Sequence, residues 1–182
     1  MAIPDPDQFR VMYAEHYDRV LRYAWRRTGA DAAADVTAEV FMVAWRRMGE
    51  VPAQQPLPWL YGVARKVVAN HLREQNRSEE LPGPMADAVL VSRDVAEQVT
   101  ARHRVHRAWQ GLSEADRELL ALIGWEGLSV RDAAKVLGCT AAACAVRLHR
   151  ARRRLQQALS QQDAEHTSDL ADAVVKGDAR CA

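Results

Sequence analysis

The segment from Leu128 to Leu155, LSVRDAAKVLGCTAAACAVRLHRARRRL, constrains the fold more than any other part of the chain. A short apolar-periodic run ends at Gly138, which can adopt the left-handed conformation of a tight turn because it has no Cβ. A second run follows, with apolar residues at offsets of 0, 4, 7 and 11 from Cys144. This spacing predicts two helices joined by a tight turn, which is the pattern of a helix-turn-helix.

Residues that cap helices precede each helical run in this region. Ser113 and Ser129 are each followed three residues later by an aspartate, an arrangement typical of a helix N-terminus. Thr140 can cap the last helix, which we expect to end near Leu159. Ala134, four residues before the turn glycine, supplies the small side chain that two crossing helices need. These signals support the helix-turn-helix prediction.

The face of the last helix opposite its apolar stripe is basic, and basic helices of this kind enter the major groove of DNA. The residues predicted to face DNA are Thr140, Ala142, Ala143, Val146, Arg147, Arg150 and Arg153. Bidentate reading of a base edge requires Arg, Lys, Asn or Gln, so Arg147 is the one good base reader in the first two turns. The later arginines should mostly contact phosphates. A helix with so few base-reading side chains suits a protein that also binds DNA at a second site, because the two linked contacts reinforce each other.

Charge is distributed in segments along the 182 residues, although the net charge is only +1. Residues 101–160 carry 11 basic and 5 acidic side chains, whereas residues 78–100 carry 1 and 5 and residues 161–182 carry 2 and 5. A basic segment between two acidic ones suggests a polyanion-binding module. The three cysteines predict neither a disulfide framework nor a zinc site, and we expect no cofactor, metal or catalytic residue.

The rest of the chain predicts an all-α protein of two small helical domains. Apolar residues recur at helical spacing in three segments before residue 78, with Gly29 and Gly49 as stops and the proline-rich PAQQPLP as a loop. We expect a first domain at 1–77, an acidic flexible linker at 78–96, a helix-turn-helix domain at 97–160 and a flexible acidic tail at 161–182. No secretory signal or long apolar run is present, so we expect a cytoplasmic protein without membrane insertion.

Three segments together resemble one family. DAAADVTAEVFMVAWRRM resembles the second conserved region of extracytoplasmic-function (ECF) sigma factors, PLPWLYGVARKVVANHLREQNR their −10-element helix, and the segment from Leu112 to Leu155 their −35-binding region. The resemblance covers about residues 6–77 and 97–159. It implies two helical domains that bind bacterial RNA polymerase and direct it to promoters, where they open the duplex.

The resemblance also implies roles for particular residues. Asp35, Glu39 and Arg46 would contact the clamp of the largest polymerase subunit, and the C-terminal domain would contact the flap of the second-largest subunit. The residues expected at the −10 element are Gln54 and Gln55 in the loop and Lys66, Asn70, Arg73 and Arg77 on the following helix. Trp59 and Tyr61 could stack on bases, although the tryptophan of this motif is more often a core residue. An anti-sigma factor is a further implied partner.

The sequence departs from the family pattern at a few positions. Ala38 stands where Gln is frequent, Asn70 where Asp is frequent, and Ala145 and Val146 where Lys-Ser is frequent, so the −35 preference cannot be transferred from relatives. A free-standing helix-turn-helix regulator, an enzyme, and an interaction adaptor without DNA binding are the alternatives. The regulator leaves the first three helices unexplained. No nucleophile–base or phosphate-binding pattern supports an enzyme.

Overall fold

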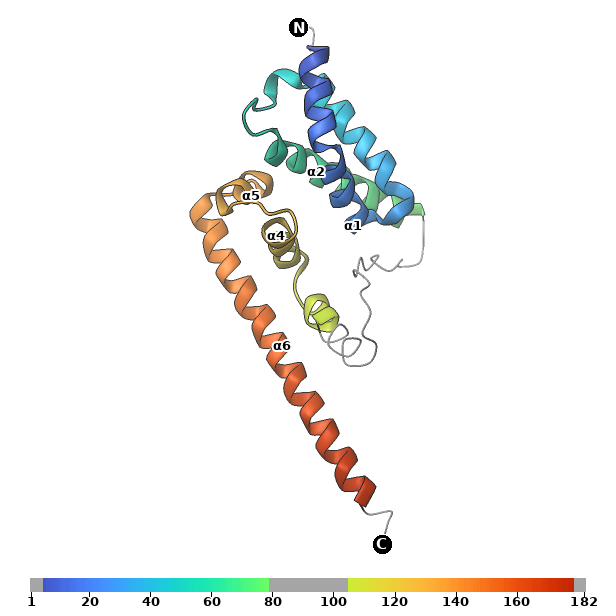
Figure 1. Ribbon diagram of the computed structural model, residues 1–182, viewed down its shortest axis with the longest axis vertical. Coiled ribbons are helices and arrows are strands. Elements are labelled where there is room, and N and C mark those ends of the chain that lie inside the picture. Colours follow the sequence, from blue (N-terminus) through green and yellow to red (C-terminus); the bar gives the residue numbers. More distant parts are fainter. Residues whose placement is uncertain (1–4, 79–104, 179–182) are drawn as a thin grey trace.

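Two helical halves of the chain pack against each other in the computed structural model, which describes residues 5–78 and 105–178, with only the backbone path for 76–78 and 163–178 (Figure 1). The N-terminal half (5–78) contains α1 (Pro6–Arg46), the short 3-10 helix η1 (Met48–Glu50) and α2 (Pro56–Ser78). The C-terminal half (105–178) contains helical residues 105–110, then α4 (Glu114–Gly124), α5 (Val130–Leu137) and α6 (Ala141–Asp178). No strand occurs in these ranges, which confirms the all-α fold class.

Helix α1 is broken at Gly29, as the sequence predicts. The backbone there has φ 80° and ψ 178°, which lies outside the helical region and favours a residue without a Cβ. The second segment of α1 returns alongside the first (Figure 1). The ring centroids of Phe9 and Trp45 are 5.1 Å apart, and those of Tyr13 and Phe41 are 4.7 Å apart. Gly29 therefore folds α1 into a helical hairpin.

The core of the N-terminal half forms where α2 packs on this hairpin. Val20, Val40 and Leu60 belong to the apolar residues that recur at helical spacing in these segments, and they are fully buried. Tyr13 has the same helical spacing but is 39% exposed. Its ring lies against other aromatic rings at the side of the hairpin, because a tyrosine can bury its ring while its hydroxyl stays in water. His16, three residues on, is buried in the first segment of α1.

The helix-turn-helix has the caps and the turn that the sequence predicts. The hydroxyl oxygens of Ser113 and Ser129 accept hydrogen bonds from backbone N–H groups three residues later, at 3.2 and 3.1 Å. Thr140 does the same for Ala143, at 3.2 Å. Gly138 is left-handed, with φ 67° and ψ 36°. Each cap satisfies an otherwise unpaired N–H group at a helix start.

The apolar stripe of α6 is also confirmed, since Cys144, Leu148 and Ala151 are buried. Helix α6, however, continues to Asp178 and does not end near Leu159. Residues 160–176 contain neither Gly nor Pro, so nothing in their sequence stops a helix. The flexibility expected for 161–182 stays a prediction.

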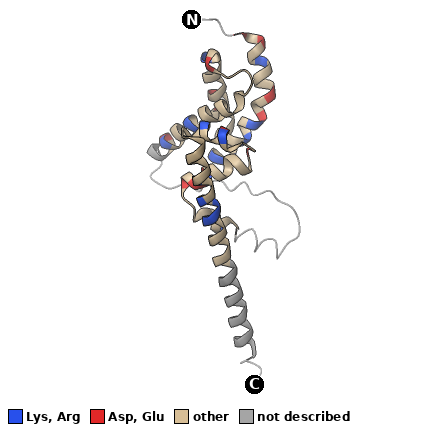
Figure 2. Cartoon of the chain, turned by 90° about the vertical axis from the view of Figure 1, so that its left-hand side faces the viewer, with Lys and Arg blue, Asp and Glu red and all other residues tan. Residues whose placement is uncertain are grey.

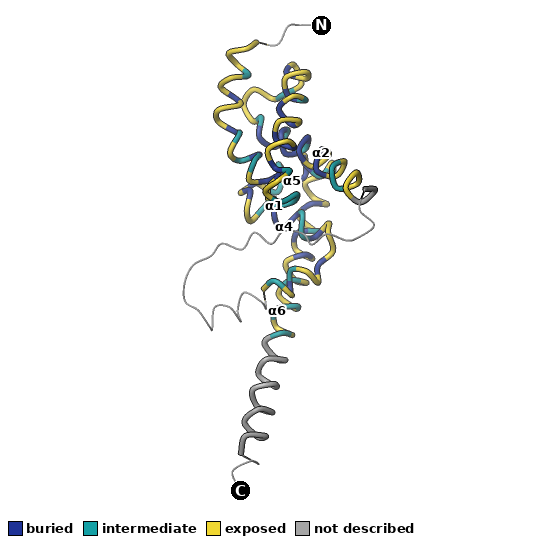
Figure 3. The backbone as a smooth tube through the Cα atoms, turned by 90° about the vertical axis from the view of Figure 1, so that its right-hand side faces the viewer, coloured by how far each residue is buried: buried dark blue, intermediate teal, exposed yellow. Residues whose placement is uncertain are grey.

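One apolar cluster includes residues of both halves of the chain. Buried positions occur in both halves (Figure 3). The cluster includes Leu60 and Val67 of α2 together with Ala133 and Val136 of α5, and α5 packs directly on α2. Most of the linker predicted at 78–96 lies outside the described residues, as do residues 97–104 and 179–182. No helix in the described ranges is both long and apolar enough to cross a membrane.

Candidate nucleic-acid interface

The first turns of α6 present the face predicted to read DNA. Ala142 and Ala143 are exposed, Val146 is 51% exposed, and Arg147 is half-buried beside them. Further along the helix Arg150 and Arg153 are exposed, and Lys and Arg form a band on this part of α6 (Figure 2). These side chains lie opposite the buried stripe. The exposed surface therefore begins with small apolar groups and continues with cations, which suits thymine methyls and phosphates respectively.

One arginine of this helix is used within the fold. Nη1 of Arg154 lies 2.5 Å from Oδ2 of Asp116, which is almost buried at the start of α4. Asp116 also donates its backbone N–H to the cap residue Ser113. This ion pair ties the basic end of the recognition surface to α4. Within the described part of the chain Arg150 and Arg153 form no ion pair of this kind, so their guanidinium groups are available to phosphates.

A second polar surface lies on α2. Lys66, Asn70 and Arg73 are exposed along one face, at spacings of four and three residues. Nη2 of Arg73 donates to Oδ1 of Asn70 at 2.7 Å, so these two side chains form one unit. Arg77 continues the helix, but its side chain is outside the described part.

The loop before α2 exposes both of the predicted glutamines. Gln54 and Gln55 precede Pro56, at which α2 begins. Nζ of Lys135, on α5, donates to Oε1 of Gln55 at 3.3 Å. The helix-turn-helix therefore contacts the loop predicted to capture a −10 base.

Neither aromatic residue of the α2 motif is presented freely to solvent. Tyr61 is fully buried, and its hydroxyl donates to Oε2 of Glu126 at 2.9 Å. Trp59 is half-buried, with the guanidinium of Arg47 5.7 Å from its ring centroid. In this arrangement Tyr61 is a core residue and cannot stack on a base.

The predicted polymerase-binding residues lie on the outer face of the second segment of α1. Asp35, Glu39 and Arg46 are all exposed, and Ala38 and Met42 lie among them. Met42 is 56% exposed. A single exposed apolar side chain is common on protein surfaces, so the evidence for this face is the exposure of its three charged residues.

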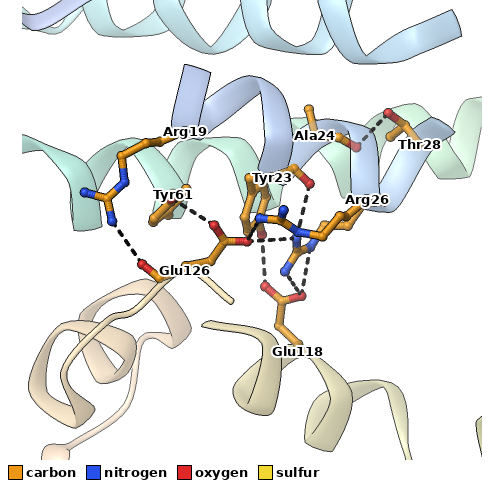
Figure 4. Close-up of polar contacts among 9 residues, drawn as sticks. Arg19, Tyr23, Ala24, Arg26, Thr28, Tyr61, Glu118 and Glu126 are labelled. Atoms are coloured by element: carbon orange, nitrogen blue, oxygen red, sulfur yellow. Dashed lines mark hydrogen bonds and ion pairs between the residues drawn. The ribbon is translucent and has the colours of Figure 1, made fainter. Parts of the chain in front are cut away.

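Sequence reasoning missed a cluster of seven residues that joins the two halves (Figure 4). We call it the inter-half cluster, and its members are Arg19, Tyr23, Arg26, Arg27, Tyr61, Glu118 and Glu126. Glu118 lies on α4 and Glu126 in the connection to α5, whereas the other five lie on α1 and α2. The paired residues are 65 to 107 positions apart and leave no periodic signal in the sequence.

Each glutamate of the inter-half cluster binds both a tyrosine and arginine side chains. Oε1 of Glu118 accepts from the Tyr23 hydroxyl at 2.9 Å, and Oε2 accepts from Nε and Nη2 of Arg27 at 3.1 and 3.0 Å. Oε1 of Glu126 accepts from Arg26 at 2.5 Å, and its backbone oxygen accepts from Arg19 at 3.0 Å. Each of the four carboxylate oxygens of Glu118 and Glu126 therefore accepts a hydrogen bond from a side chain of the N-terminal half.

Both tyrosines act as stable hydrogen-bond donors. Burial, together with the charge of Glu118, raises the pKa of Tyr23 well above its usual value. Burial and the charge of Glu126 likewise raise the pKa of Tyr61. Because a higher phenol pKa favours the protonated form, both hydroxyls keep the proton that they donate at neutral pH.

A cavity of about 710 Å³ lies beside this cluster, between α1, α2 and α4. Its lining includes Lys66 and Arg73 of the α2 surface and the ring pair Trp109–Trp125, whose centroids are 4.8 Å apart. Part of the surface predicted to bind the −10 strand therefore faces the C-terminal half.

Comparison with known proteins accounts for both halves. The family model for sigma-70 region 2 matches residues 12–78, and the model for sigma-70 region 4 matches residues 102–155. The RNA polymerase sigma-H factor of Pseudomonas aeruginosa is 31% identical over 143 residues, which cover 71% of this chain and 74% of that protein. The chain belongs to the family of RNA polymerase sigma factors. The region 2 match explains the helices that a free-standing regulator would leave unexplained, and sigma factors are not enzymes.

Another relative supports this assignment, and a solved structure has a similar fold. The ECF RNA polymerase sigma factor BldN of Streptomyces coelicolor is 33% identical over 162 residues, which cover 85% of this chain but 61% of BldN, so the chain spans less than two thirds of that relative. The sigma factor RpoE of Bartonella quintana, solved in complex with the anti-sigma factor NepR, matches with a TM-score of 0.64 at 24% identity, and the match covers 84% of this chain and 96% of RpoE. That similarity shows the fold.

Proposed function

We propose that the chain is a sigma factor that binds core RNA polymerase and directs promoter recognition, promoter melting and transcription initiation. The observation that carries the proposal is the presence, in one chain, of two separate exposed polar surfaces, on α2 and on α6. A DNA-binding regulator that acts without polymerase needs only the surface on α6. Two linked weak DNA contacts gain affinity from their effective concentration, which compensates for a recognition helix with few base readers.

At the −35 element, the first turns of α6 enter the major groove. Arg147 reads a base, while Ala142, Ala143 and Val146 contact methyl groups or simply fit closely. Thr140, Arg150 and Arg153 contact phosphates, since a helix start and exposed guanidinium groups both favour anions.

At the −10 element, Gln54 and Gln55 hold an extruded base, and the α2 residues follow the non-template strand. Lys66, Arg73 and Arg77 neutralise phosphates, and Asn70 orients Arg73 through their hydrogen bond. Capture of an unstacked base requires a shaped pocket, because unstacking costs a few kcal/mol. The proline-bounded loop loses less entropy than a flexible one when it closes around the base.

Asp35, Glu39 and Arg46 bind the clamp of the largest polymerase subunit, and the C-terminal half binds the flap of the second-largest subunit. A charge-removal variant, Asp35→Asn with Glu39→Gln, should weaken binding to core polymerase by about tenfold, or about 1.4 kcal/mol. The matched control is Glu15→Gln with Asp18→Asn, which removes the same charges from the exposed first segment of α1. Equal binding of the two variants would contradict the assignment of this face.

Run-off transcription on a promoter library tests the function as a whole. Core polymerase prepared from cells that encode the chain should start transcripts at defined sites only when the chain is added. Retention of DNA without polymerase would favour a free-standing regulator, and retention of polymerase without transcripts would favour an adaptor. We also propose a cytoplasmic location and an anti-sigma partner, which fractionation and affinity purification would test.

A further inference from the structure

The cavity between α1, α2 and α4 has a strongly basic lining. Two acidic side chains line it, Glu114 and Glu118, against six basic ones. The basic ones are Arg26, Arg27, Arg65, Lys66, Arg73 and Arg117. A concave surface lined by charges of one sign concentrates ions of the opposite sign. The lining therefore favours an anion.

The fold itself neutralises part of this charge and leaves the rest available. Arg26 pairs with Glu126, and Arg27 pairs with Glu118. Within the described part of the chain, Arg65, Lys66 and Arg117 form no ion pair. These three cations, together with Arg73, are therefore available to an anion in the cavity.

Arg117 shows the clearest need for an acceptor. It is half-buried on α4, and its Nε is buried without a hydrogen-bond partner in the part of the chain that the structure describes. A buried donor that lacks an acceptor costs free energy, especially when it carries a charge. An anion bound beside this guanidinium would offset that cost.

The same cavity also has an aromatic side. The rings of Trp109 and Trp125 line it with their centroids 4.8 Å apart, and Trp125 is 57% exposed. Val68 and Leu72 of α2 add aliphatic surface to the lining. An exposed indole offers a face on which a planar ring can stack. The cavity volume of about 710 Å³ lies within the range of about 300–1,000 Å³ that is usual for small-molecule sites.

We propose that this cavity binds a free nucleotide, with its phosphates among Arg65, Lys66 and Arg117 and its base against the two tryptophan rings. A nucleotide joins a planar aromatic ring to several negative charges, so it uses both sides of the lining. An inorganic phosphate would leave the rings unused, and an uncharged aromatic compound would leave the cations unused. Binding of the nucleotide does not depend on the proposed function. If that function holds, the nucleotide and the −10 strand compete for Lys66, which lines the cavity and is also proposed to contact the strand.

Isothermal titration calorimetry of the full chain with ATP, CTP, GTP and UTP tests the proposal. We expect at least one of the four to bind saturably, with one molecule per chain. The matching nucleoside and inorganic triphosphate should each bind at least about tenfold more weakly, because each makes only one of the two linked sets of contacts.

Two variants locate the site independently. Arg117→Ala removes the unpaired cation and Trp125→Ala removes the exposed ring, and each should weaken nucleotide binding by about tenfold. The matched controls are Arg107→Ala and Trp25→Ala, which change exposed residues outside the lining and should leave the affinity unchanged. Circular dichroism verifies that each variant keeps its helices. If one of the two site variants fails to fold, the other decides.

Each contrary result overturns a stated part of the proposal. Lack of saturable binding of all four nucleotides at millimolar concentration would overturn it entirely, and equal losses in site and control variants would overturn the location. Inorganic triphosphate binding as tightly as the nucleotide would overturn the assigned ligand class. Binding of a single-stranded DNA oligonucleotide, without binding of the four nucleotides, would overturn it in favour of a path for a promoter strand. Failure of run-off transcription would contradict only the proposed function, since the calorimetry uses the chain without polymerase.

Discussion

The hydroxyl of Tyr61 donates a hydrogen bond of 2.9 Å to the carboxylate of Glu126, which lies 65 positions later in the chain. Tyr61 belongs to α2, the helix proposed to bind the −10 element, and Glu126 to the connection between α4 and α5. The core of one sigma region is therefore completed by a side chain of the other.

Tyr61→Phe should lower the free energy of unfolding by about 1–3 kcal/mol, because it leaves a buried carboxylate oxygen without its donor. Urea denaturation followed by circular dichroism measures the change. Tyr13→Phe is the matched control, since its ring is partly exposed and its hydroxyl can bind water. Equal losses in the two variants would show that the hydrogen bond to Glu126 contributes nothing.

Two glycine-to-alanine substitutions should change the free energy of unfolding in opposite directions. Gly138→Ala should destabilise the protein by about 1–2 kcal/mol, because a Cβ disfavours the left-handed turn conformation. Gly62→Ala, inside α2, should stabilise it by about 0.4–1 kcal/mol, because alanine restricts the unfolded chain. A Cβ built at either position meets no atom within 4 Å, so packing does not interfere. Thermal unfolding of both variants makes the comparison, and a shift of the same sign in both would contradict it.

Arg147→Ala should reduce discrimination between promoters by about 1–3 kcal/mol, whereas Arg153→Ala should weaken binding to all sequences alike. The reason is the division between a base reader and a phosphate contact. Competition binding on a −35 library at several salt concentrations separates the effects, because loss of a phosphate contact lowers the salt slope by about 1. Uniform effects from Arg147→Ala would refute its role as a reader.

Acid should destabilise the fold through His16. Burial lowers the pKa of this histidine, and this effect outweighs the attraction of Glu15. His16 takes up a proton near pH 6.5 in the unfolded chain and only at lower pH in the folded chain. The free energy of unfolding therefore keeps the contribution of neutral His16 above about pH 6.5 and loses it as the pH falls below that value. Free energies of unfolding measured at pH values from about 7.5 to about 5 should show this decline. His16→Leu should reduce the decline, whereas His149→Gln, at an exposed position, should keep it.

The local features of the fold could be predicted from the sequence because they depend on neighbours in the chain. The caps at Ser113, Ser129 and Thr140 and the turn at Gly138 follow from residues within a few positions of each helix end. The stripe that begins at Cys144 follows from helical spacing alone. Most of the predicted polymerase- and DNA-binding residues are exposed, as expected, whereas Arg147 is half-buried and the side chain of Arg77 lies outside the described part. The roles of all these residues stay predictions.

The docking of the two halves could not be predicted in this way. Glu118 and Arg27 are 91 positions apart, and each reads as an ordinary charge on a helix surface. The family resemblance suggested that Tyr61 could stack on a base. Its burial could not be predicted, because nothing near it in the sequence shows that Glu126, 65 positions away, binds its hydroxyl. The position of Tyr13 at the side of the hairpin likewise depends on Phe41, with which its ring packs.

The uninterrupted course of α6 from Ala141 to Asp178 has a practical consequence. At 1.5 Å per residue its 38 residues make a rod of about 57 Å, with the turn proposed to enter the major groove at one end. A fluorophore or affinity handle fused after the far end would stand well away from the major groove. Such a fusion could therefore be used to follow the protein without blocking its binding to promoter DNA.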